Sequence, residues 1–190
     1  MQVALRAVSR SFVFVIAAAL LSPFSLPSRS AKPKPPGPAQ TVDKFCRLDF
    51  DGVRLSSTHP STAEFARLIG GEGDWPDEPV KIVAAFRLLS VRENQDAAAV
   101  KVEYKLSGQL RGALEADRMS LERRSENVEF LLFRTEGLWK VKVFDLPPHV
   151  STPALRDHIR DVMKDDEKQG DSHRRDLLRR LLLRLGSTGP

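Results

Sequence analysis

Cysteine and aromatic residues other than phenylalanine are scarce in this sequence. Its 190 residues include one Cys, one Tyr and two Trp. The lone Cys46 excludes an intrachain disulfide framework and any zinc site built from cysteines. The sequence also lacks a serine nucleophile elbow, a phosphate-binding glycine loop and an HExxH pattern. These absences exclude the enzymes and metalloproteins that short motifs identify most directly.

Positive charge is concentrated at the ends of the chain and is balanced in the middle. The formal net charge is +5, but residues 37–150 contain 16 basic and 18 acidic residues. A nucleic-acid-binding domain needs a basic face, so we expect no nucleic acid among the partners. A hydrophobic fraction of 41% and a charged fraction of 29% are those of an ordinary globular domain.

The first thirty residues have the order of a secretory signal peptide. Two arginines precede an uncharged segment with its apolar centre at Phe12–Leu21, and small residues follow. Two prolines interrupt the segment, so its unbroken part is shorter than the roughly 20 residues of a membrane-spanning helix. We expect residues 1–30 to direct export to the periplasm or the cell exterior, with an uncleaved membrane anchor as the alternative. Residues 31–38, AKPKPPGP, predict an extended proline-rich linker.

Helical periodicity opens the central region, residues 39–150. Val42, Phe45 and Cys46 follow a helical spacing and predict a helix from Thr41 to about Asp51. The segment Ser61–Glu64 fits a capping box and predicts a second helix that ends at the glycines after Ile69.

Strand periodicity follows Pro79. Val80–Glu93 is predicted to be a long apolar strand, buried on both faces for much of its length. Ser107–Asn127 has no clear period and is either a long loop or a short helix. Helices followed by hairpin-linked strands predict an α+β fold, with N-terminal helices packed on a curved antiparallel four-stranded sheet. The other three predicted strands are Ala99–Leu106, Val128–Arg134 and Leu138–Asp145.

Four segments of this region resemble the nuclear transport factor 2-like (cystatin-like) superfamily. They are TVDKFCRLDFDG, the hairpins around ENQDAAAVKVEY and FLLFRTEGLWKVKVF, and the closing LPPHV. The resemblance covers about residues 39–150 and implies a curved sheet that wraps around a helix and forms a conical pocket. The superfamily contains enzymes, transport adaptors and exported proteins without an assigned activity, so the resemblance does not decide the function.

The inward positions of the predicted helix and strands define a candidate apolar pocket. Such a lining suits an apolar small molecule or a peptide, and the same residues equally describe a filled core. We therefore expect a small exported binding protein without a cofactor or a metal. The expected lining residues are Phe45, Val100, Val102, Tyr104, Phe130, Trp139 and Val141.

The resemblance also implies an alternative function as a cofactor-free lyase or isomerase. Enzymes of the superfamily place an Asp with a His or Tyr inside the cone, where burial raises the pKa of the carboxyl group and makes it a base near neutral pH. Tyr104 lies at an inward position, and Asp49 and Asp51 are the nearest candidate bases. A Tyr on a half-buried strand usually packs, however, and acids at a helix end are usually solvated. His149 is expected at the surface or at a pocket mouth.

The last forty residues, 151–190, predict a helical extension with a leucine- and arginine-rich end. In His173–Leu185 the leucines cluster on one side of a helix and most arginines lie opposite. This helix docks on its own domain, pairs with a second copy or another protein, or lies on an anionic membrane surface. The charged segment before it favours the last two interpretations over docking. The candidate surface residues are Leu177, Leu178, Arg179, Arg180, Leu181, Leu182, Arg184 and Leu185.

The membrane interpretation predicts that the leucine- and arginine-rich end holds the protein on lipid. Removal of Asp171–Pro190 should then lower the fraction of protein that co-sediments with anionic liposomes, because both the apolar and the basic side of the helix are lost. Equal sedimentation of the intact and the shortened protein would contradict a role of this segment in membrane binding.

Overall fold

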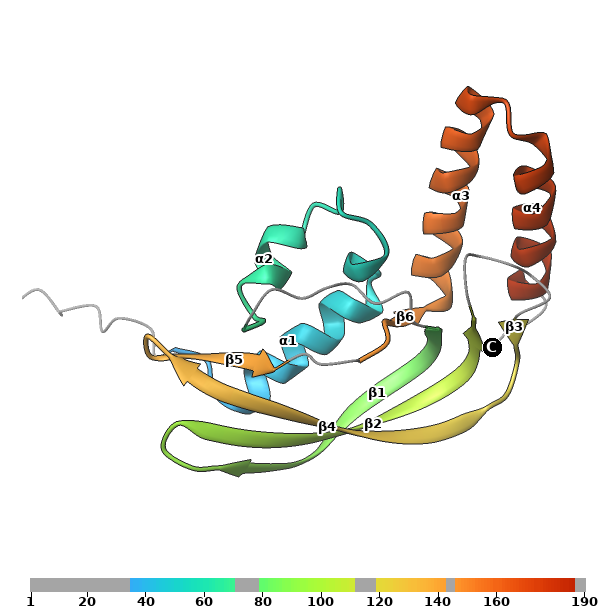
Figure 1. Ribbon diagram of the computed structural model, residues 1–190. Helices are drawn as coiled ribbons and strands as arrows, with labels where there is room; N and C mark the ends of the chain where they lie inside the picture. The colour runs from blue at the N-terminus through green and yellow to red at the C-terminus, as the bar shows by residue number, and fades with distance from the viewer. Residues whose placement is uncertain (1–34, 71–78, 112–118, 143–145, 187–190) are drawn as a thin grey trace, which may run out of the picture. The chain divides into compact units, whose positions relative to one another are not determined.

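A curled sheet with helices on its concave side and at one end makes up the described part of the chain (Figure 1). The computed structural model describes residues 35–70, 79–111, 119–142 and 146–186, which all belong to the unit Lys34–Pro190. This arrangement confirms the predicted α+β class. The predicted signal peptide and most of the predicted linker lie outside the described residues.

The sheet has six strands where the sequence predicted four, and it is mixed where the sequence predicted an antiparallel sheet. Its order is β5-β4-β2-β1-β6, with β3 paired to β2. All pairs are antiparallel except β6, which runs parallel to β1. The strands are β1 (Val80–Glu93), β2 (Ala97–Leu110), β3 (Met119–Ser120), β4 (Arg124–Thr135), β5 (Leu138–Lys142) and β6 (His149–Ser151).

The sequence predicted either a long loop or a short helix for Ser107–Asn127. In the structure this segment extends the sheet. Its described residues form the end of β2, all of β3 and the start of β4, where Leu106 pairs with Arg124. Polar side chains on both strands hide the alternation there. Residues 112–118 and 143–145 lie outside the described residues, so the end predicted for the last strand, Asp145, does too.

The prediction that β1 is buried on both faces is wrong. Only Ile82 and Val83 are buried, and most of the strand from Ala84 onward is exposed. The reason is the position of β1 in the sheet. The short β6 pairs only with Lys81–Val83, so the rest of β1 has no described strand on that side. Its apolar residues therefore lie partly at the sheet edge.

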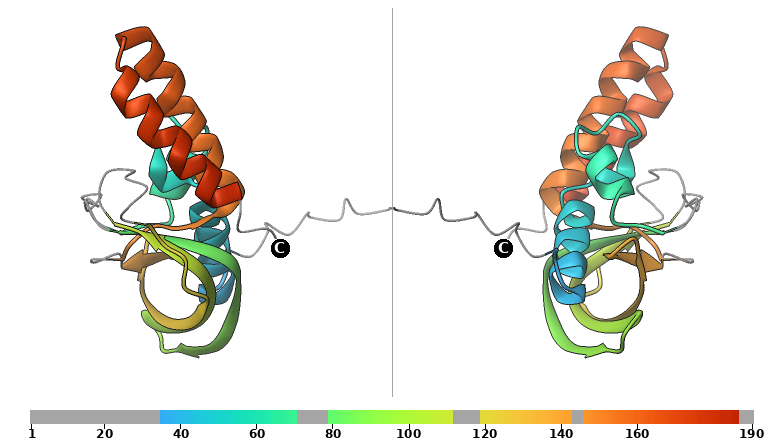
Figure 2. Two further views of the ribbon diagram at one scale, coloured as in Figure 1. Left: turned by 90° about the vertical axis from the view of Figure 1, so that its right-hand side faces the viewer. Right: turned by 90° about the vertical axis from the view of Figure 1, so that its left-hand side faces the viewer.

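Helix α1 (Pro38–Phe50) packs against the concave side of the sheet, whose curl is seen in the end views of Figure 2. It begins earlier than predicted, since a proline is well tolerated in the first helical turn. Val42, Phe45 and Cys46 are buried together with the inward residues of β2, β4 and β5. This cluster is the main core.

The predicted capping box at Ser61 is not formed. Helix α2 spans only Thr62–Ala66, and the Ser61 side chain makes no capping hydrogen bond. Glu64 instead forms an ion pair with Lys44 of α1. The carboxylate that would have capped α2 therefore links the two N-terminal helices.

The C-terminal helices α3 (Thr152–Gln169) and α4 (Ser172–Gly186) form a helical hairpin at one end of the sheet. Gly170 provides the left-handed backbone of its turn, with φ of 77°. Leu178, Leu181 and Leu185 of α4 are buried in a second core with residues of α3, β1 and β2. In this structure the three leucines therefore face their own chain. Binding of a partner or a membrane through them stays a prediction, and it would require α4 to leave this position.

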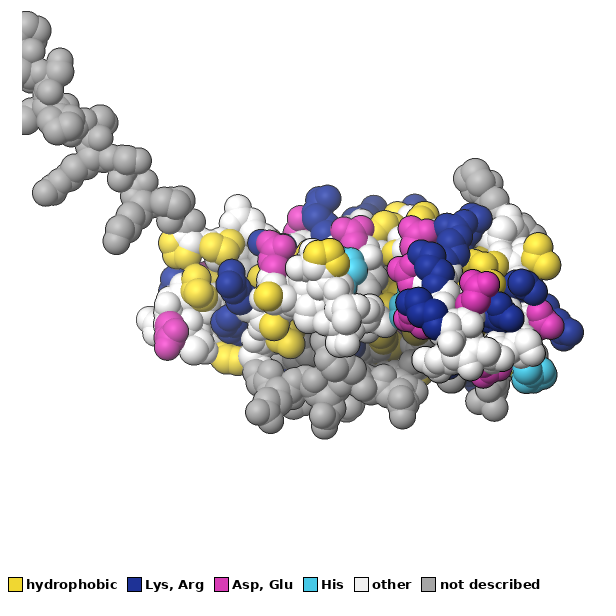
Figure 3. Space-filling model, turned by 90° about the horizontal axis from the view of Figure 1, so that it is seen from above, with side chains coloured by type: hydrophobic (Ala, Val, Ile, Leu, Met, Phe, Trp, Pro, Cys, Tyr) yellow, Lys and Arg dark blue, Asp and Glu magenta, His cyan; other side chains and the backbone are white. Residues whose placement is uncertain are grey.

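The outward side of the helical hairpin carries charges of both signs (Figure 3). Ion pairs three residues apart join Arg160 to Asp157, and Lys164 to Asp161. Among the leucines of α4, Leu183 is the exposed one, with 75% of its surface accessible. Among the described helices, none is both long and apolar enough to cross a membrane.

We predict that Gly108→Ala destabilises the protein. A Cβ atom at position 108 would lie 2.5 Å from the Ser120 carbonyl oxygen, so β2 and β3 would have to separate. The free energy of unfolding, measured by urea denaturation, should fall by about 1–3 kcal/mol. Gly186→Ala is the control, because a Cβ at position 186 meets no atom within 4 Å. Equal stabilities of the two variants would contradict the close approach.

Candidate functional site

Five polar side chains lie buried between α1, β2 and β6. All are at most 8% exposed, and three of them have no exposed surface at all. One comes from the short 3₁₀ helix η1 (Val53–Leu55), which follows α1. We call this set the buried polar cluster: Cys46, Asp49, Arg54, Tyr104 and His149.

Asp49 is the centre of the buried polar cluster. Its Oδ2 atom accepts a hydrogen bond of 2.9 Å from the backbone N–H of His149, one hundred residues further along the chain. The Arg54 guanidinium lies 3.6 Å from the same oxygen and also donates to the Leu146 carbonyl. The other carboxylate oxygen, Oδ1, has no hydrogen-bond partner among the described residues. Asp49 therefore joins the end of α1 to η1 and β6.

Burial controls the charges in this cluster. It raises the pKa of Asp49 to about 6, and the Arg54 charge and the His149 N–H lower it by less. Burial lowers the pKa of His149 to about 3, with the Pro147 carbonyl opposing the change. At pH 7, Asp49 is thus ionised beside Arg54, and His149 is neutral.

Tyr104 and Cys46 form the apolar side of the cluster. The Tyr104 hydroxyl and the Cys46 sulfur are 3.1 Å apart, and the Tyr104 ring stacks on His149 with a centroid distance of 4.1 Å. Burial raises the pKa of Tyr104 above its ordinary range and the pKa of Cys46 to about 12. Both groups are therefore protonated at neutral pH, and a protonated thiol is a poor nucleophile.

The structure brings together the two predicted catalytic candidates, Tyr104 and Asp49, and leaves Asp51 exposed. The expectation that His149 lies at the surface or a pocket mouth is wrong, because β6 carries it into the core. Sequence reasoning missed Arg54. Gly52, with φ of 85°, turns the chain back beneath α1, and only this turn places the arginine beside Asp49.

The seven predicted pocket residues also come together. Each is at most 5% exposed, and all belong to the main core. The Phe45 ring contacts Phe65 at 4.8 Å and Phe130 at 5.4 Å between centroids. These contacts are those of close-packed side chains. A ligand among them would have to displace α1 or its rings, so the apolar pocket inside the cone stays a prediction.

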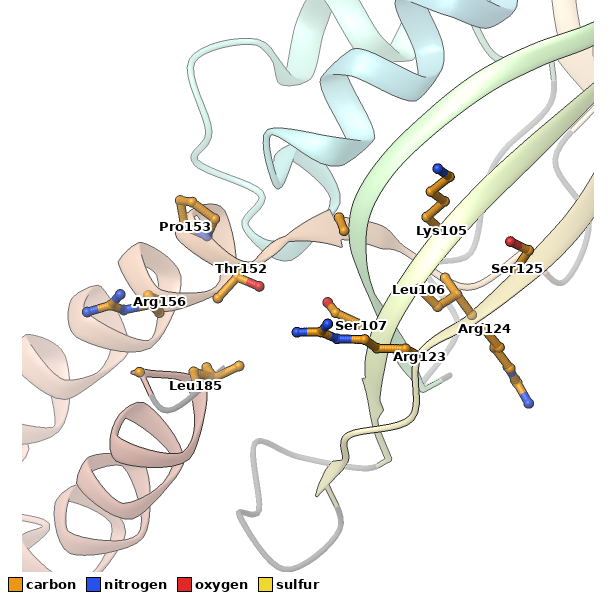
Figure 4. Close-up of a pocket in the computed structure, with 12 residues that line it drawn as sticks. Lys105, Leu106, Ser107, Arg123, Arg124, Ser125, Thr152, Pro153, Arg156 and Leu185 are labelled. Atoms are coloured by element: carbon orange, nitrogen blue, oxygen red, sulfur yellow. The ribbon is translucent and has the colours of Figure 1, made fainter. Parts of the chain in front are cut away.

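A separate hollow of about 740 Å³ lies between the sheet and the helical hairpin (Figure 4). Its walls come from β1, β2, β4, the first residues of α3 and the last residues of α4. Most of its exposed lining is apolar, and no acidic residue is among its twelve described lining residues. The basic lining residues are Lys105, Arg123, Arg124 and Arg156, and the hydroxyl-bearing ones are Ser107, Ser125 and Thr152.

The basic residues of the hollow differ in direction. Figure 4 shows Arg123 extending from the sheet toward the helical hairpin, next to Ser107, whereas Arg124 points away. Arg124 also approaches Glu126 at 3.7 Å, while Arg123 has no ion pair with a described residue. Sequence reasoning missed Arg123, since it lies in a charged segment without a clear period.

A smaller recess of about 320 Å³ lies between the loop after α1 and the outer side of α3. Asp51, His59, Asp157, His158 and Asp161 are among its lining residues. Within the described ranges, however, no three His, Cys, Asp or Glu side chains are grouped so that they could hold a metal ion. The recess is therefore not a preformed metal site in the described part of the chain.

The pKa values of the buried polar cluster predict a pH-dependent effect of Asp49→Asn. The folded pKa of Asp49, about 6, is above its ordinary value of 3.8, so its contribution to stability is lost as pH rises from about 4 to 6. The contribution of His149 is opposite, because its folded pKa of about 3 is below 6.5, and it is lost as pH falls. Asp49→Asn has no carboxyl group at this position and so lacks the Asp49 contribution. From pH 4 to pH 7 the free energy of unfolding of the variant should therefore rise relative to that of the wild type.

Urea denaturation of the wild type and Asp49→Asn at several pH values measures this difference. Asp51→Asn is the matched control, because Asp51 is exposed two residues further on. A stability difference between Asp49→Asn and the wild type that stays constant from pH 4 to 7 would refute the prediction.

Comparisons of the chain with protein-family models, with curated proteins and with solved structures give no match. Function is therefore inferred from the side chains of the buried polar cluster and the hollow.

Proposed function

We propose that the protein is an exported, non-catalytic binding protein whose ligand occupies the hollow between the sheet and the helical hairpin. The hollow itself is the observation that carries this proposal. Its volume of about 740 Å³ is within the range of roughly 300–1,000 Å³ that is usual for ligand sites. Leu106, Pro153 and Leu185 offer an apolar surface, and Ser107 and Thr152 offer hydroxyl groups that can orient a ligand.

Binding is better supported than catalysis. No His, Cys, Asp or Glu is among the described residues that line the hollow, so Lys105 is the one described lining residue of a type that commonly serves in general acid–base catalysis. The groups with strongly shifted pKa values are in the buried polar cluster, where Asp49 already binds the His149 N–H and Tyr104 already contacts Cys46. A lyase or isomerase using Tyr104 and Asp49 would need its substrate to enter a packed core.

We also propose that the domain belongs to the nuclear transport factor 2-like superfamily. Two features support this proposal. Helix α1 packs on the concave side of a curled sheet, and the chain after β5 crosses back to place β6 beside β1. Export is supported by the order of residues 1–30, and it is tested by the mass of the protein recovered from the cell envelope or the medium.

A tryptophan that fills the hollow should block the site. Ala84→Trp introduces a large ring at a lining position, whereas the neighbouring Ala85→Trp places the same ring at an exposed position outside the lining. The probe is N-phenyl-1-naphthylamine, a neutral dye whose fluorescence rises in apolar sites. We expect the wild type and Ala85→Trp to bind it, and Ala84→Trp to bind it about tenfold or more weakly, since an occupied volume excludes the ligand.

Thermal unfolding of both variants verifies that the tryptophans leave the fold intact. Absence of dye binding by the wild type, or equal binding by the wild type and both variants, would overturn the assignment of the site to the hollow.

A further inference from the structure

We infer that the hollow recognises a ligand with an anionic head and an apolar chain, and that Arg123 and the start of α3 hold the head. This inference rests on the proposed function, since it names the chemistry of the ligand in the same hollow. The charge of the lining is the first reason for it. Four basic residues and no acidic residue surround the hollow among the described residues.

Among the described residues, two arginines of the hollow, Arg123 and Arg156, lack the acidic partners that other arginines of the sheet have. On the outer face of the sheet, Arg87 pairs with Glu103 and Arg92 pairs with Glu129. Within the described residues, no such ion pair is found for Arg123 or Arg156 of the hollow. Like charges brought together without a counter-charge repel one another, and an anionic ligand removes that repulsion.

Arg156 is the basic residue that α3 contributes to the lining of the hollow. Its Nε atom is buried and has no hydrogen-bond partner among the described residues. A buried donor without a partner is costly, by about 1–3 kcal/mol or more when it is charged. Figure 4 shows the Arg156 guanidinium directed away from Arg123 and the sheet, so Arg156 adds positive charge near the hollow, and Arg123 is the arginine placed to bind the head.

The start of α3 points to the same ligand charge. Thr152 and Pro153, its first two residues, line the hollow. The N-terminus of a helix of 18 residues carries a partial positive charge, which favours an anion nearby. The Ser151 side chain already accepts the N–H of Ala154, so the Thr152 hydroxyl and the charge of the helix end remain for a ligand.

The direction of the side chains separates a head region from a tail region. Arg123 extends across the hollow, and its planar guanidinium can bind a carboxylate through two parallel hydrogen bonds (Figure 4). Ala84, Leu106 and Leu185 supply the apolar part of the lining. Ala84 and Pro153 are the exposed apolar residues of the lining, and a small inorganic anion would leave them in water, whereas an apolar chain attached to the anion would cover them. The ligand class that fits both regions is an amphipathic anion.

Cis-parinaric acid and its methyl ester test this inference, because they have the same fluorescent apolar chain and differ in the charge of the head. We expect the wild type to bind the acid about tenfold or more tightly than the ester, the effect of one charged hydrogen-bonding pair. Arg123→Gln should remove that preference. Arg92→Gln is the control, since Arg92 pairs with Glu129 on the outer face of the sheet and does not line the hollow, and it should keep the preference.

Each result of this titration decides between the two proposals. Equal binding of acid and ester by the wild type overturns the anionic head and leaves the proposed function standing. The same follows if Arg92→Gln loses as much affinity as Arg123→Gln. Binding of neither probe overturns both proposals. Displacement of the acid by free laurate supports a soluble carboxylate as the ligand, and displacement only by phosphatidylglycerol vesicles supports an anionic lipid headgroup.

Discussion

The buried carboxylate of Asp49 is the interaction on which the arrangement of the other elements depends. It accepts the backbone N–H of His149 and neutralises the charge of Arg54, which is buried beside it. A buried ion pair adds little net stability, but removal of one partner typically costs about 3–5 kcal/mol because the other charge stays buried. Asp49 thus makes three segments of the chain interdependent: the end of α1, the 3₁₀ turn just after it and the distant β6.

This constraint also positions the hollow. His149 opens β6, which ends at Ser151, and α3 begins at the next residue. The Asp49 carboxylate ties β6 to the end of α1, and β6 leads directly into the first residues of α3. Helix α4 returns along α3 and brings Leu185 back to the same wall. The buried polar cluster and the hollow are therefore connected through β6, a strand of only three residues.

The buried polar cluster and the hollow differ in their electrostatics. This difference distinguishes residues that stabilise the fold from residues that can bind a ligand. In the buried polar cluster every charge has a counter-charge or is suppressed by burial, as in the neutral His149 and the protonated Cys46. In the hollow no acidic residue is among the described lining residues, and Arg123 and Arg156 have no ion pair with a described residue. Perturbed pKa values often indicate catalytic sites. In this protein the perturbed pKa values result from the burial of Asp49 and His149, which connect α1 to β6. The positive charge without an acidic lining residue is in the hollow, where a ligand can enter.

The sequence alone determined the features that depend on residues close together in the chain, such as the position of a strand and the buried side of a helix. The strand period predicted Val80–Glu93 with both ends as observed, and the apolar spacing of Val42, Phe45 and Cys46 predicted which side of α1 is buried. From these patterns the α+β class followed. Only the tertiary structure decided the positions of β6, Arg54, His149 and Arg123, because each depends on a contact between segments far apart in the chain. A three-residue strand has no period to detect, and an arginine beside a buried acid has the same local sequence as one in solvent. Periodicity reports which face is apolar, and only the folded chain shows what lies against that face.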